Sequence, residues 1–247
     1  ARGKIIYGNA SGATALLAAG SNGTVLTSDG TDISWSAASG GVTFKEGGTN
    51  FTNSLLVGTD STGTLSSADG NTGVGTGVFG ALTSGDNNVA VGFNALDVNT
   101  TGSSNTAIGK DSLKVNTTAS SNTAVGDATL TANTTGASNT AVGFGALFAN
   151  TTALHNVAVG RVALTANTTG TCNIAMGVNS LLANTTGNNN VAIGFCANAT
   201  STDRNDNTAI GYEALKVNTG IGNTAVGARA ADSNTSAEGI TAVGNRA

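Results

Sequence analysis

The sequence predicts an all-β protein, a parallel β-solenoid or β-roll of about eleven 17-residue coils that follows a small N-terminal β element. Gly recurs every 17 residues from Gly75 to Gly211, then at Gly227 after a 16-residue step, and again at Gly244. A variant of Asn-Thr-Ala-Val precedes each of these glycines. Gly and β-branched residues dominate, Pro is absent, and no 3.6-residue period appears, so helices are not expected.

The chain is predicted to divide into three segments. Residues 1–41 lie outside the repeat and predict a β neck or shaft module, because Asn22-Gly23 and Asp29-Gly30 are turn signals on either side of a short β-rich run. Residues 42–70 predict a transitional segment with a degenerate first coil, and the repeat solenoid occupies residues 71–247. The chain lacks an initial Met and a signal-peptide pattern, which predicts a fragment or a processed chain.

The consensus unit is Asn-Thr-Ala-Val-Gly-x-x-Ala-Leu-x-x-Asn-Thr-Thr-Gly-x-x, and we number its positions 1 to 17. The run that ends in Gly predicts one short strand, and the small residue and Leu at positions 8 and 9 predict a second strand in the same coil. Side chains of a strand alternate between its faces, so position 3, which is Ala, and position 4 should point to opposite sides.

Each predicted strand therefore has one small and one large apolar column, and both faces should be buried. A solitary coil buries only its inside, so the other face should pack on further copies of the chain around an axis. The sequence leaves open which column lines the coil and which faces a partner. The predicted core and interface residues are Val91, Ile108, Val125, Val142, Val159, Ile193 and Ile210 at position 4, and Leu96, Leu113, Leu130, Leu147, Leu164 and Leu181 at position 9.

Asn-Thr-Thr-Gly at positions 12 to 15 predicts a turn, since Asn and Gly tolerate positive φ. Stacked in register, the Asn side chains should form a hydrogen-bonded ladder. The same residues form Asn-x-Ser/Thr sequons, but a motif that recurs once per coil is better explained by the turn than by glycosylation. The predicted ladder residues are Asn99, Asn116, Asn133, Asn150, Asn167 and Asn184.

Composition argues against several function classes. The net charge is −4, whereas a nucleic-acid-binding surface would be basic, and no 18-residue apolar run predicts a transmembrane helix. The single His155 has no repeated acidic partner, and Cys172 and Cys196 fall at different positions of the repeat, so free thiols are expected. Scattered carboxylates such as Asp60 and Asp86 match no calcium-binding loop. We expect no enzyme, metal or cofactor.

Aromatic residues form the one candidate binding column. Phe93, Phe144, Phe195 and Tyr212 all occupy position 6. Exposed aromatic rings can stack on sugars, so these residues are candidate glycan contacts, although such rings also cover turns or pack between chains.

The run Asn-Thr-Ala-Val-Gly-x-x-Ala-Leu-x-x-Asn-Thr-Thr-Gly resembles repeats of phage tail-fibre and related surface proteins, and Gly20 to Trp35 resembles a short module of phage fibres. Thr83 to Gly92 is also similar to marine phage fibre sequence, so the resemblance covers most of the chain. The repeat is similar to the heads of trimeric autotransporter adhesins too, whose coils of about 14 residues form left-handed β-rolls.

The resemblance implies a homotrimer. It also implies a structural or attachment segment of a fibre, located on a virion or outside the cell, that presents or spaces binding to a cell-surface glycan or protein receptor. A bacterial adhesin head is the alternative, and an ice-binding solenoid that uses a Thr column is a weaker one, because adjacent Thr134 and Thr135 should point to different sides.

Overall fold

The computed structural model describes residues 5–8, 14–17, 24–28, 33–37, 43–48, 51–58 and 66–247, with side chains described for 53–58 and 66–247. The chain divides into two compact units, Ala1–Thr43 and Phe44–Ala247. In the first unit, β1 (Ile5–Gly8) pairs antiparallel with β2 (Thr14–Leu17), and β3 (Thr24–Ser28) pairs antiparallel with β4 (Ile33–Ala37). The turns predicted at Asn22-Gly23 and Asp29-Gly30 lie outside the described residues.

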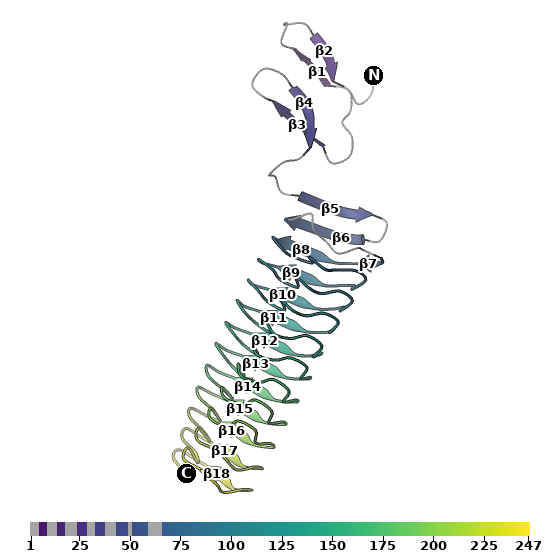
Figure 1. Ribbon diagram of the computed structural model, residues 1–247. Helices are drawn as coiled ribbons and strands as arrows, with labels where there is room; N and C mark the ends of the chain where they lie inside the picture. Colours follow the sequence, from purple (N-terminus) through teal and green to yellow (C-terminus); the bar gives the residue numbers. More distant parts are fainter. Residues whose placement is uncertain are drawn as a thin grey trace. The chain divides into compact units, whose positions relative to one another are not determined.

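The second unit is a parallel β-solenoid (Figure 1). Its strands form one sheet in chain order. From β6 through β8 to β18 each strand of this path is displaced by one coil from the last, β5 lies beyond β6 at the end of the sheet, and β7 pairs with β6 beside the path. At about 4.8 Å per coil, the coils from Asn71 onward span about 50 Å. The strands are β5 (Thr43–Gly48), β6 (Phe51–Gly58), β7 (Ala68–Asp69), β8 (Thr72–Gly75), β9 (Val89–Val91), β10 (Thr106–Ile108), β11 (Thr123–Val125), β12 (Thr140–Val142), β13 (Val157–Val159), β14 (Ile174–Met176), β15 (Val191–Ile193), β16 (Thr208–Ile210), β17 (Thr224–Val226) and β18 (Thr241–Val243).

The register of the sheet follows the sequence repeat. Thr106 of β10 lies opposite Thr123 of β11, and Ala107 opposite Ala124, so identical positions stack. The degenerate coil joins in the same way, because Leu55 of β6 lies opposite Thr72 of β8, 17 residues later. The structure therefore confirms the predicted parallel β-solenoid of about eleven turns.

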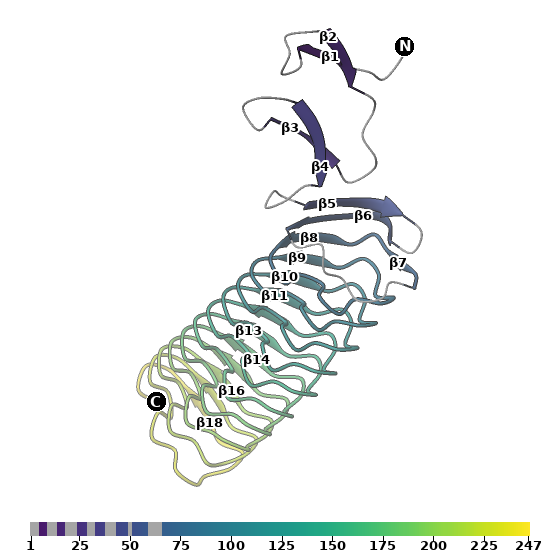
Figure 2. The ribbon, with the colours of Figure 1, turned by 45° about the horizontal axis from the view of Figure 1, so that its top comes forward.

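Each regular coil contains one strand, and the prediction of a second strand at positions 8 and 9 was wrong. That segment is a series of turns, and Figure 2 draws the regular coils with strand on one side alone. The backbone explains the difference. Positions 7, 9 and 17 have positive φ, with Leu113 at 48° and Leu130 at 51°, and an extended strand requires negative φ.

The positive φ at position 9 turns the Leu side chain into the coil. A left-handed conformation costs a non-Gly residue about 1–2 kcal/mol. Full burial of a Leu side chain contributes about 1.5–3 kcal/mol, which offsets that cost. The Leu residues at this position are completely buried, as is the Ala column at position 3, so these two columns form the apolar interior.

Gly at position 5 permits the closest approach between coils. Gly109 has a φ of +136°, and a Cβ on it would lie 2.3 Å from the carbonyl oxygen of Gly126 in the next coil. Any side chain there would force the coils apart. Positive φ does not occur at Gly136 of an Asn-Thr-Thr-Gly turn, so the predicted turn geometry belongs to positions 5, 7, 9 and 17 instead.

Gly109→Ala should lower the free energy of unfolding by about 3 kcal/mol or more, because it combines a backbone clash with positive φ. Gly239→Ala is the matched control: its φ is +64°, but a Cβ there meets no atom within 4 Å, so a loss of about 1 kcal/mol is expected. Chemical denaturation measures both values. Equal losses would show that crowding between the position-5 glycines contributes nothing.

Candidate functional site

The outer side of the parallel sheet is formed by positions 2 and 4 of the coils, and we call this surface the sheet face. Because Ala at position 3 points inward, its neighbours on each strand must point outward. The sheet face consists of Thr72, Val89, Thr106, Thr123, Thr140, Val157, Ile174, Val191, Thr208, Thr224 and Thr241 at position 2, and Val74, Val91, Ile108, Val125, Val142, Val159, Met176, Ile193, Ile210, Val226 and Val243 at position 4.

The sheet face is uncharged and partly exposed: position 4 is a column of Val, Ile and Met, and position 2 has Thr in seven coils and Val or Ile in four. Ile108 is 40% exposed, and Met176, Ile193 and Ile210 are exposed to a similar extent. No charged residue occurs at positions 2 or 4, whereas charged residues of the regular coils lie at positions 6, 7, 10 and 14 to 17. The sequence left open which of the two large apolar columns lines the coil. In the structure the Leu residues lie in the interior, and the Val and Ile residues at position 4 lie on the sheet face.

The predicted Asn ladder at position 12 is present and buried. Asn116 Nδ2 donates to Asn99 Oδ1 in the preceding coil at 2.9 Å, and Asn133 Nδ2 donates to Asn116 Oδ1 at 3.0 Å. The ladder continues through Asn150, Asn167 and Asn184. The amides of Asn99, Asn116, Asn133, Asn150, Asn167 and Asn184 are fully buried, so the folded coils leave none of these six sequon residues accessible for glycosylation.

A second Asn ladder runs through position 1, and sequence reasoning missed it. Asn105 donates from its backbone N and from Nδ2 to Asn88 Oδ1, at 2.9 and 3.1 Å. Both ladders share an acceptor, because Asn105 Nδ2 and Asn116 Nδ2 each donate to the carbonyl oxygen of Ala119. The recurrence of Asn directly before each strand was the signal in the sequence.

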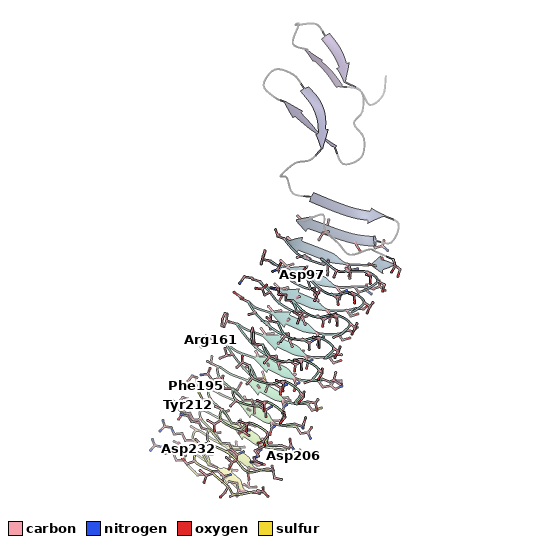
Figure 3. All side chains as sticks on the ribbon, in the orientation of Figure 1. Asp97, Arg161, Phe195, Asp206, Tyr212 and Asp232 are labelled. Carbon is pink, nitrogen blue, oxygen red and sulfur yellow. The ribbon has the colours of Figure 1, made fainter. Side chains whose placement is uncertain are left out.

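The aromatic residues at position 6 follow the Gly at the C-terminal end of each strand. Figure 3 labels two of them, Phe195 and Tyr212, which lie one above the other in successive coils. Phe93 and Phe144 are about half exposed. Phe195 and Tyr212 stack on each other with centroids 5.5 Å apart, and the Arg229 guanidinium lies 5.7 Å from the centre of the Tyr212 ring.

These contacts limit which rings could bind a sugar. One face of Phe195 and both faces of Tyr212 are occupied, and Arg161 lies 6.0 Å from the centre of Phe144. Glycan contact by Phe93, Phe144, Phe195 and Tyr212 stays a prediction, and Phe93 is the ring for which the described residues show neither a stacking nor a cation–π contact.

Glu213 forms ion pairs with two cationic residues beside the Tyr212 ring. Its Oε1 accepts from Lys216 Nζ at 2.7 Å, and its Oε2 accepts from Arg229 Nε at 3.1 Å. The hydrogen bond from Lys216, followed by the positive charges of Lys216 and Arg229, holds the pKa of Glu213 below its usual range. The carboxylate thereby fixes Arg229 against the Tyr212 ring.

The remaining candidate residues lie apart. His155 is exposed at position 17, and both cysteines are free thiols, Cys172 exposed and Cys196 partly buried. Asp86 Oδ1 accepts a backbone hydrogen bond from Asp69, and Asp60 lies outside the described residues. Within the described ranges, no three His, Cys, Asp or Glu residues are grouped to hold a metal ion. The same part of the chain has no helix long and apolar enough to span a membrane.

Comparisons with known proteins give no relative from which to transfer a function. No protein-family model matches the chain, and neither does any curated protein or solved structure.

Glu213→Gln should lower the melting temperature at pH 7 and have a smaller effect in acid. A carboxyl group whose folded pKa is lowered stabilises the fold above its unfolded pKa, about 4.3, and loses that effect as pH falls through the folded value. Melting curves between pH 7 and pH 2 measure the difference, with Glu238→Gln at an exposed carboxylate as control. A difference independent of pH would contradict this role of the ion pairs.

Proposed function

We propose that the chain is a structural segment of a homotrimeric fibre, as in phage tail fibres or related virion appendages, that spaces or presents host-receptor binding. The supporting observation is the sheet face, an uncharged strip with an exposed column of Val, Ile and Met, on a coil whose other positions carry charges. Large exposed apolar patches on a protein surface mark interaction sites. Such a segment acts outside the cell or on a virion.

A second and a third copy of the chain fit the sheet face better than a charged partner does. The strip is about 50 Å long. Two partly exposed side chains per coil leave on the order of 1,000 Å² to cover, comparable with the ~800 Å² per partner of a standard interface. Identical chains placed around a common axis would bring these strips together without burying a charge, and closed cyclic symmetry would end the assembly.

The geometry of the rod suits a spacer. In-register stacking makes it regular along its length, and its described residues contain no group of three His, Cys, Asp or Glu placed to hold a metal ion. A head of the trimeric autotransporter type would use the same rod, and a downstream coiled coil and membrane anchor in the full gene would favour that alternative over a fibre.

An ice-binding role receives less support. Thr134 Oγ1 at position 13 donates to the carbonyl oxygen of Thr151 in the next coil, while Thr135 at position 14 is exposed. In the Asn-Thr-Thr-Gly turns, the first Thr of the pair is therefore bound to the backbone, and only the second is left to form an exposed column.

Val142→Asp should dissociate the oligomer and leave the coil folded. Val142 lies on the sheet face, and an unpaired charge buried between chains costs about 3–5 kcal/mol. Ala141→Asp, one residue away but inside the coil, should instead unfold the neighbouring coils. Sedimentation measures the assembly and circular dichroism the fold.

Lys110→Ser, at an exposed position outside the sheet face, is the control and should change neither the sedimentation nor the circular dichroism of the chain. If Val142→Asp sediments like the parent chain, the sheet face is not the interface and the proposal fails.

A further inference from the structure

The coil formed by residues 190–206 differs from its neighbours on the inside. Asn198 occupies position 9, where most coils place Leu, and Ser201 occupies position 12, where the ladder has Asn. Both residues are buried: Asn198 is 0% and Ser201 1% exposed. Two polar replacements therefore lie in the interior of one coil.

These replacements leave four buried polar atoms without a hydrogen-bond partner among the described residues. They are Asn198 Nδ2, Asn198 Oδ1, Ser201 Oγ and Asn184 Oδ1. Asn184 Oδ1 has no partner because the Asn ladder at position 12 ends at Asn184. Asn167 Oδ1 accepts from Asn184 Nδ2 at 3.0 Å, but Ser201 has no amide with which to continue the column, and its side chain is two heavy atoms shorter.

Ser201 occupies the place above Asn184 in the stacked column, 17 residues later, which is the position from which the next ladder Asn would donate to Asn184 Oδ1. Asn198 lies three residues before Ser201 in the same coil. In the preceding coil the equivalent positions are linked by the hydrogen bond from Asn184 N to the Leu181 carbonyl oxygen at 3.2 Å. We call this part of the interior, at positions 9 and 12, the corner of the coil.

We propose that this corner is a binding site for buried water, one or two molecules that replace the missing ladder amide. The shortening from Asn to Ser opens about the room of one water, whose share of liquid volume is ~30 Å³. Water donates two hydrogen bonds and accepts two, which suits the two carbonyl acceptors, the amide donor and the hydroxyl. A metal cation suits the corner less well, because none of the four atoms belongs to a charged group.

A water at this site would complete both the ladder and the interior. It would donate to Asn184 Oδ1 as the next Asn does elsewhere and bond the Asn198 amide, which the neighbouring Leu side chains cannot do. Buried waters of this kind typically make about three hydrogen bonds to otherwise unpaired groups.

The test is a crystal structure of the full chain at a resolution that shows ordered water. We expect a peak at about 2.7–3.2 Å from Asn184 Oδ1 and from Ser201 Oγ. A dry corner in which Asn198 turns to bond a protein atom would overturn the proposal. So would a peak with the shorter contacts of a bound cation, about 2.3–2.6 Å.

Magnetic relaxation dispersion, which counts long-lived internal waters in solution, gives an independent readout. The double variant Asn198→Leu/Ser201→Asn restores the consensus and should have at least one long-lived water fewer than the parent chain. The reverse change in a regular coil, Leu130→Asn/Asn133→Ser, should gain one. An unchanged count in the repaired variant would overturn the proposal even if the reverse variant does not fold.

Discussion

Register between successive coils is the constraint on which the rest of this structure depends. The strand ladder, both Asn columns and the position-13 hydroxyls all join a residue to its equivalent 17 residues away. One residue is missing from the coil that begins at Asn207, yet Asn223 N still donates to Asn207 Oδ1 at 3.0 Å, and Asn234 Nδ2 still donates to Asn218 Oδ1 at 3.1 Å. The segment that is one residue shorter therefore lies between the two ladder residues Asn218 and Asn223, in a turn that contains Gly220 and Gly222.

The thin interior determines what the outside looks like. Ala, Leu and the Asn amides fill each coil, and Gly at position 5 keeps neighbouring coils close. This leaves no room inside for the β-branched side chains at positions 2 and 4, so they form an outer surface that a single chain cannot cover. The proposed trimer follows from this inversion, in which polar amides are buried and Val and Ile are exposed.

Several features could be predicted from the sequence because they depend only on which residues stack. The period fixed the solenoid and the number of coils, and Asn at position 12 predicted a ladder. The direction of side chains could not be predicted in the same way. Leu130 points inward from a turn because its φ is positive, and Leu chemistry gives no sign of that backbone conformation. The expectation of two strands per coil failed for this reason.

The candidate site shows the same limit. The sequence identified the Val and Ile column at position 4 but could not decide whether it lined the coil. Phe195 and Tyr212 occupy position 6 of successive coils, so their stacking was within reach, whereas the contact of Tyr212 with Arg229, which is at position 7, was not. The second ladder at position 1 was within reach, since Asn recurs there from Asn71 to Asn223. Its side chains were overlooked because the adjacent apolar strand dominates the pattern.

The solution mass of the chain, measured by light scattering, decides whether the sheet face is an interface between copies of the chain. We expect three times the 23.8 kDa mass of one chain, because three sheet faces are then covered around one axis. A stable particle with the mass of a single chain would contradict it, since the sheet face would then remain in water without a partner.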